Sequence, residues 1–185
     1  MRWLSVDPAT KTGIARWDGP RLVSVATLRP LLAAEQRAHP EAALVLVTGA
    51  TIIPFATPFA AWGAMLAGAQ MVVVEEGMGS AEKSIAQLAF RRGYIAHAAA
   101  SRGARHIEVN SKRWKKVVGT KYGEKFPGYS KLDKEHAIAL VAKHFGLTVL
   151  GDEADAILVG VWALEPRVAE APERKKAKKT RTVQS

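Results

Sequence analysis

The chain opens with RWLSVDPATKTGIARW at residues 2–17, two apolar runs joined by a short polar turn. Such runs on either side of a turn are typical of paired β-strands, here over 2–7 and 12–17. A third apolar run, over 22–28, follows the turn signal Asp18-Gly19-Pro20. We therefore expect three consecutive strands that form an antiparallel meander.

Strands and helices alternate beyond the meander. Apolar runs predict strands over 44–47, 71–75 and 106–109. Helical patterns cover 59–67, 81–100, 133–145 and 152–164, and a basic segment lies over 112–125. A meander followed by this alternation predicts an α/β domain over residues 1–164, in which helices flank a mixed sheet of antiparallel and then parallel strands.

No residue from Ala42 to Val74 is charged, and a run of this length raises the question of a membrane span. Glycines and prolines interrupt it, so two buried strands with a loop and a helix between them fit better. We expect no membrane segment.

The start, MRWLSVDPAT, lacks a long apolar region and predicts no secretory signal. The absence of cysteine agrees with a reducing cytoplasm.

The 185 residues include 27 basic and 17 acidic side chains, which gives a net charge of +10 and points to a polyanionic partner such as nucleic acid. With 48% hydrophobic residues the chain has enough apolar material for a core. The lack of cysteine excludes a disulfide scaffold, a Cys-ligated zinc site and a thiol nucleophile. Residues 165–185 are rich in Lys and Arg, and we expect them to form a disordered basic tail.

Four carboxylates interrupt the apolar pattern. Asp7 and Glu75 end predicted strands, while Asp152 and Asp155 stand three apart at the head of an apolar helix, on one face of it. Each has a simpler explanation, as a turn former, a first solvated residue, an N-cap or an acid near the positive helix end. If the two strands are neighbours and the helix packs across them, all four converge. Such a cluster needs a cation, and oxygen ligands suit Mg²⁺ or Mn²⁺.

The runs SVDPATKTG (5–13), VEE (74–76) and DEADA (152–156) resemble the acidic motifs of RuvC-type Holliday junction resolvases, which have a ribonuclease-H-like fold. The resemblance extends to 79–93, Val117-Val118-Gly119 and the helix led by Lys134, and it is patchy between Arg29 and Ala69. The compact single domain and the basic tail suit a phage-type member of this family.

This resemblance implies a metal-dependent endonuclease that cuts opposed strands of a four-way DNA junction as a homodimer. Asp7, Glu75, Asp152 and Asp155 would be its catalytic residues and would hold two Mg²⁺ ions per active site, with Mn²⁺ as a substitute. Glu76 is left out because neighbouring residues of a strand point to opposite faces. Family members often carry an aromatic residue shortly after the glutamate, where this chain has Met78, which can wedge between bases but stacks less well.

The basic segment supplies candidate DNA-binding residues, with Trp114 and Tyr122 among them. Lys131 and Lys134 are the candidates for gripping the cleaved strand, and a solvated helix face is the alternative for both. The remaining candidates are Arg102, Arg105, Lys112, Arg113, Lys115, Lys116 and Lys121.

Three other functions were compared with this one. A sugar-kinase or actin-type ATPase is disfavoured, because Pro8 and Ala9 stand where its phosphate loop requires glycine. A ribonuclease-H-like nuclease that processes structured RNA would use the same carboxylates and stays open. A non-catalytic nucleic-acid-binding protein with this fold also stays open, although the presence of all four acids argues against it.

Overall fold

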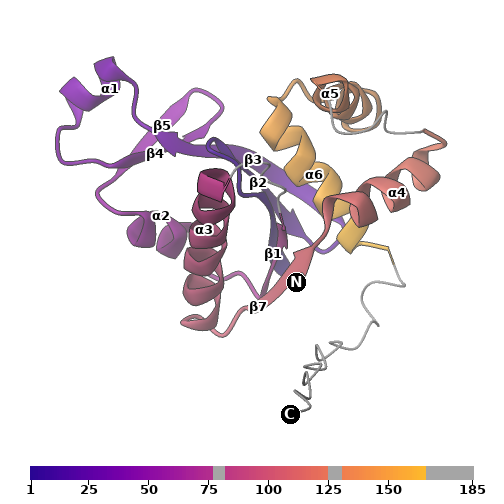
Figure 1. The fold of residues 1–185 in the computed structure, drawn as a ribbon, viewed down its shortest axis with the longest axis horizontal. Coiled ribbons are helices and arrows are strands. Elements are labelled where there is room, and N and C mark those ends of the chain that lie inside the picture. The colour runs from indigo at the N-terminus through magenta and orange to yellow at the C-terminus, as the bar shows by residue number, and fades with distance from the viewer. Residues whose placement is uncertain (77–81, 125–130, 166–185) are drawn as a thin grey trace, which may run out of the picture.

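The structure is a computed structural model that describes residues 1–76, 82–124 and 131–165, with side chains from 86 and 134 onward in the helices that begin at 82 and 131. Within these residues a seven-stranded sheet runs in the order β5-β4-β3-β2-β1-β6-β7 (Figure 1). The strands are β1 (Arg2–Asp7), β2 (Thr12–Asp18), β3 (Arg21–Pro30), β4 (Leu44–Thr48), β5 (Thr51–Phe55), β6 (Met71–Glu75) and β7 (Arg105–Val109). The helices are α1 (Ala33–Ala38), α2 (Pro58–Met65), α3 (Glu82–Ala100), α4 (Ser111–Tyr122), α5 (Lys131–Phe145) and α6 (Gly151–Ala163).

The predicted mixed sheet is confirmed. Strands β1 to β5 pair antiparallel in chain order, while β6 pairs parallel with β1 and β7 parallel with β6. The basic segment forms α4, which begins where the Asn110 side chain accepts a hydrogen bond from the Lys112 amide (3.0 Å) and ends at Gly123 with a φ of 68°. None of the helices in the described ranges has both the length and the apolar character needed to cross a bilayer.

Two elements were not predicted from the sequence. Strand β5 contains Pro54, which reads as a breaker, but β5 is the edge strand of the sheet, where a missing amide costs no ladder hydrogen bond. Helix α1 carries no buried residue and so no apolar signal. It is fixed instead by Glu35, which binds the Arg29 guanidinium through two hydrogen bonds of 2.7 Å.

The helices cover the two faces of the sheet. Helices α4, α5 and α6 lie on one face, and α2 and α3 lie on the other (Figure 1). Successive residues of β1 alternate between two cores, with Trp3 under α6 and Leu4 and Val6 under α2 and α3. The same alternation turns Asp7, the last residue of β1, toward α6.

Helix α6 approaches β2 closely at two glycines. A Cβ atom at Gly13 would lie 1.8 Å from the Asp152 carbonyl oxygen, and one at Gly160 would lie 2.3 Å from the Trp17 ring. Trp17 is itself fixed, because it stacks on Trp3 at 5.1 Å between ring centroids and donates a 2.8 Å hydrogen bond to the Ser5 hydroxyl. These contacts hold the first turn of α6 beside the end of β1.

We predict that Gly13→Ala destabilises the protein by about 1–3 kcal/mol, because a methyl group there forces the start of α6 away from β2. Urea unfolding followed by circular dichroism measures the loss. Gly93→Ala is the matched control, since a Cβ atom at that exposed position of α3 meets nothing within 4 Å. The control is expected to be neutral or to stabilise by up to about 1 kcal/mol. Equal losses in both variants would contradict the close contact at Gly13.

Candidate active site at the ends of β1 and β6

Asp7 and Glu75 lie at the carboxyl ends of adjacent parallel strands. Val6 pairs with Val74 in the ladder between β1 and β6, so the two acids that follow are neighbours. Both side chains face α6 and are buried, with 8% and 7% of their surface exposed. An acid that merely begins a solvated loop would be exposed, so the simpler explanation offered for Glu75 does not apply.

Helix α6 adds the other two acids. Glu153 caps this helix, because its carboxylate accepts a hydrogen bond from the Leu150 amide (3.0 Å) and another from the Thr27 hydroxyl (2.9 Å). Asp152 is therefore not the N-cap. Asp155 lies one turn further and is 8% exposed. The structure thus brings all four predicted acids to one place.

The charges of the four carboxylates act on one another. The pKa of Asp7 is raised well above its ordinary value, first by burial and then by the charges of Glu75, Asp155 and Asp152. Burial and the charge of Glu75 are the largest causes that raise the pKa of Asp155 to about 7. Burial and mutual repulsion both favour the protonated forms of Asp7 and Asp155, and a nearby positive charge would offset the cost of ionising them.

Two side chains partly compensate the acids. Lys134 of α5 forms an ion pair with Asp152. Burial alone would lower the pKa of Lys134, but the hydrogen bond to Asp152 and the charges of the neighbouring acids outweigh it and raise the pKa. Ser111, at the start of α4, donates a hydrogen bond to Glu75. Ser111 was not predicted from the sequence, in which its only signal is its place directly after the Asn110 helix cap.

Glu76 faces a different partner. Its carboxylate accepts a 3.1 Å hydrogen bond from the Asn110 side chain, and its amide donates to the Val109 carbonyl. Glu76 therefore contacts the start of α4 and is not among the charges that raise the pKa of Asp7 or Asp155.

The donor set at this site consists of oxygen atoms, which is the set that Mg²⁺ and Mn²⁺ prefer. Within the described ranges, no three acidic or histidine side chains surround a common point closely enough to hold an ion. Glu75 is hydrogen-bonded to Ser111 and Asp152 to Lys134. The fit to a divalent cation rests on the chemistry of the site, in which buried carboxylates repel one another and a cation would offset that repulsion.

The candidate DNA-binding residues fall into two groups. Lys115 lies close enough to lower the pKa of Asp155, and α4 begins beside Glu75, since Val109 at the end of β7 pairs with Glu75. Arg113 of the same helix lies 5.7 Å from the Trp162 ring, and Lys121 binds Glu165. Among the candidates on α4, four are exposed: Lys112, Arg113, Lys116 and Lys121.

Arg102 and Arg105 are not brought to the acidic site. Arg105 pairs with Met71 at the start of β6, at the opposite end of that strand from Glu75. Arg102 belongs to the turn before β7. Met78 and the side chain of Lys131 lie outside the described residues, as do residues 166–185 of the basic tail.

Comparison with solved structures finds RuvC from Thermus thermophilus. The structure "T. thermophilus RuvC in complex with Holliday junction substrate" matches with a TM-score of 0.59 over 90% of this chain and 95% of that one, at 16% identity. The chain has the fold of RuvC. A second T. thermophilus RuvC structure matches with a TM-score of 0.53 over 91% of this chain and 97% of its own, at 17% identity. No family model and no curated protein matches the sequence. The resemblance read from the acidic motifs is thus confirmed at the level of the ribonuclease-H-like fold.

We predict that the metal-free protein loses stability as the pH rises from about 4 to 7. Over this pH range Asp155 is protonated in the folded protein but ionised in the unfolded chain. The protonated carboxyl therefore contributes to the free energy of unfolding at low pH, and this contribution is lost as the pH rises to the folded-state pKa of about 7. The loss is on the order of 3 kcal/mol. Urea unfolding in EDTA across this range measures it.

Asp155→Asn should flatten this pH dependence, and only in part, because Asp7 titrates in the same direction. Glu41→Gln is the matched control, because Glu41 is exposed and lies outside the elements that carry the four acids. This variant should leave the dependence of stability on pH unchanged. A wild-type protein whose stability rises steadily over this range would contradict the buried acidic cluster.

Proposed function

We propose that this protein is a metal-dependent endodeoxyribonuclease that resolves four-way DNA junctions by hydrolysing phosphodiester bonds in opposed strands. The observation that carries the proposal is the convergence of Asp7, Glu75, Asp152 and Asp155 at one edge of a RuvC fold. The net charge of +10 suits a DNA partner, and the T. thermophilus RuvC neighbour is in complex with a Holliday junction substrate.

The four carboxylates would hold two Mg²⁺ ions, or Mn²⁺ in their place. When bound, the ions supply an acidified water and charge stabilisation for the leaving 3′ oxygen in an in-line displacement. Asp7 ends β1, which lies between β2 and β6, and the charges of the other three acids all act on it, so Asp7 would suit the role of a ligand shared by both ions. Ser111 orients Glu75 through its hydrogen bond, and Lys134 adds a positive charge at the edge of the site.

Positive side chains on α4 would bind the backbone of the cleaved strand. Lys112 and Lys116 are exposed on the helix that starts beside Glu75, and Lys115 already acts on the pKa of Asp155. Phosphate contacts of this kind position DNA without reading its sequence. The basic residues of 165–185 would add further contacts whose strength depends on salt.

A four-way junction presents two strands for cleavage, so a two-fold homodimer would place one acidic site on each. Such an enzyme would act in the cytoplasm of a bacterial or phage-infected cell, where its DNA substrate lies. Light scattering on the protein with and without junction tests the dimer.

Asp7→Asn should reduce junction cleavage by more than about 100-fold, since the loss of even an outer-shell partner of a metal ligand costs about 10- to 100-fold. Junction binding should stay intact, because the substitution adds neither bulk nor positive charge. The assay is Mg²⁺-dependent cutting of a synthetic four-way junction labelled on each strand in turn. Glu76→Gln is the matched control and should keep its activity, since Glu76 contacts Asn110 rather than the acidic cluster. Full activity in Asp7→Asn, or cleavage of structured RNA without cleavage of the junction, would refute the proposal.

Mg²⁺ should stabilise the wild-type protein against unfolding at pH 8, by about 2.7 kcal/mol when the ion is present at 100 times its dissociation constant. The gain arises because the folded chain binds the ion and the unfolded chain does not. Urea unfolding with Mg²⁺ or with EDTA measures it without any DNA. In Asp7→Asn most of the gain should vanish, whereas Glu76→Gln should keep it. An equal gain in all three proteins would mean that the ion acts elsewhere.

A further inference from the structure

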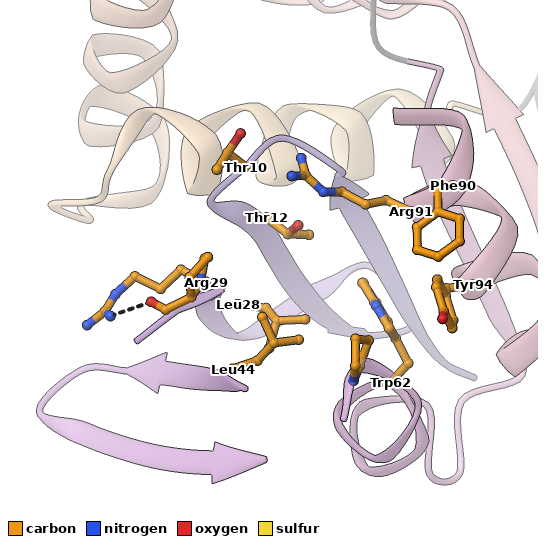
Figure 2. A pocket seen from close by; sticks show the side chains of 11 residues that line it. Thr10, Thr12, Leu28, Arg29, Leu44, Trp62, Phe90, Arg91 and Tyr94 are labelled. Carbon is orange, nitrogen blue, oxygen red and sulfur yellow. Dashed lines mark hydrogen bonds between the residues drawn. The ribbon is translucent and has the colours of Figure 1, made fainter. Parts of the chain in front are cut away.

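A pocket of about 180 Å³ lies beside the turn that joins β1 to β2. Figure 2 shows that its side chains come from this turn, from the sheet and from α2 and α3. Thr12 and Leu28 point into it from the face of the sheet opposite to the acids. The pocket and the acidic cluster therefore lie on opposite faces of the sheet, near the carboxyl end of β1, where Asp7 and Pro8 separate them.

Aromatic rings form one wall of this pocket. Trp62 of α2 is nearly buried, whereas Phe90 of α3 is 65% exposed at the rim. Phe90 and Tyr94 lie edge to face, with 4.7 Å between ring centroids and an 85° angle between their planes (Figure 2). With Leu28 and Leu44 opposite, the lining suits the flat face of an aromatic ligand.

Two guanidinium groups complete the lining. Arg91 reaches from α3 to the Pro8 carbonyl, 3.4 Å away, and so lies in the lining beside the residue that follows Asp7. Arg29 is held by its two hydrogen bonds to Glu35 and so keeps one orientation. Of the two, Arg91 is the one without a carboxylate partner among the ion pairs described for this region, and it can bind an anion.

We infer that this pocket receives one unstacked nucleobase of the strand that crosses the acidic centre, with Arg91 on the phosphate of that nucleotide. A simple anion would gain nothing from the aromatic wall, and an apolar ligand would gain nothing from the guanidinium. A nucleotide carries both a flat ring and a negative charge, and the chain has a net charge of +10. The inference rests on the proposed function and adds to it a contact that selects the nucleotide near the cleaved bond.

The test replaces one base at a time by an abasic nucleotide on either side of the cleavage site and measures junction binding in EDTA. For the wild-type protein, one position should weaken binding by about 5- to 100-fold, the range for loss of a stacked base. In Tyr94→Leu, which keeps the pocket apolar, the penalty at that position should shrink to less than about twofold.

Arg91→Gln serves as a second variant with an independent readout. It should lower the slope of log affinity against log salt by about 0.9, the value for one lost phosphate contact. Arg92→Gln is the matched control, because Arg92 is the next residue of the same helix and pairs instead with Glu108 of β7 at 3.6 Å. The control should keep both the salt slope and the abasic penalty.

The inference would be overturned if abasic replacement weakened binding equally at every position of the strand. It would also be overturned if Tyr94→Leu kept the wild-type abasic penalty and Arg91→Gln kept the wild-type salt slope. Conversion of a dimer to a monomer by Phe90→Ala would also overturn it, since a second copy of the chain would then occupy the rim. Cleavage of the junction by the wild-type protein with Mg²⁺ is scored separately. Its absence would reject the proposed function, whereas cleavage with a flat abasic profile would reject the pocket alone.

Discussion

The start of α6 lies against β2 at a distance that only a glycine permits. At Gly13 the Asp152 carbonyl occupies the space of a side chain, and at Gly160 the Trp17 ring does the same further along the helix. This contact joins the first and the last of the described elements, because β1 and β2 come first in the sequence and α6 comes last among them. Without this contact, Asp152 and Asp155 would not meet Asp7, and the carboxyl ends of β1 and β6 would carry two acids rather than four.

Burying these acids works against folding. The pKa values of Asp7 and Asp155 are raised, which means that ionising them costs free energy in the folded state. Lys134, the Ser111 hydroxyl and the positive end of α6 offset part of that cost. Apolar packing offsets the rest, above all in the core under α4, α5 and α6, where Trp3, Trp17 and Trp114 are almost wholly buried. The packing of this core thus holds together a cluster of like charges that is unfavourable by itself.

Much of this arrangement could be predicted from the sequence, because period-2 and period-3.6 apolar patterns follow directly from burial. The meander, β6, β7, α3 and α6 were all predicted, and the order of the acidic motifs indicated where the acids lie. Strand β5 was missed because Pro54 interrupts its apolar run, and α1 was missed because it buries no residue and so carries no apolar pattern. Ser111 was missed for another reason. Its contact with Glu75 exists only because β7 pairs with β6, and strand order is not written in local periodicity.

Basic residues that lie close together in the sequence do not all lie close together in the structure. Arg105 begins β7 and Lys112 follows its end, so one strand length separates two residues that are close in sequence. Side chains alternate along β1, so Val6 faces α2 and α3 whereas Asp7 faces α6. The carbonyl of the next residue, Pro8, accepts a hydrogen bond from Arg91 of α3. A residue at the end of a central strand thus lies between two chemically different surfaces, one acidic and one aromatic and basic.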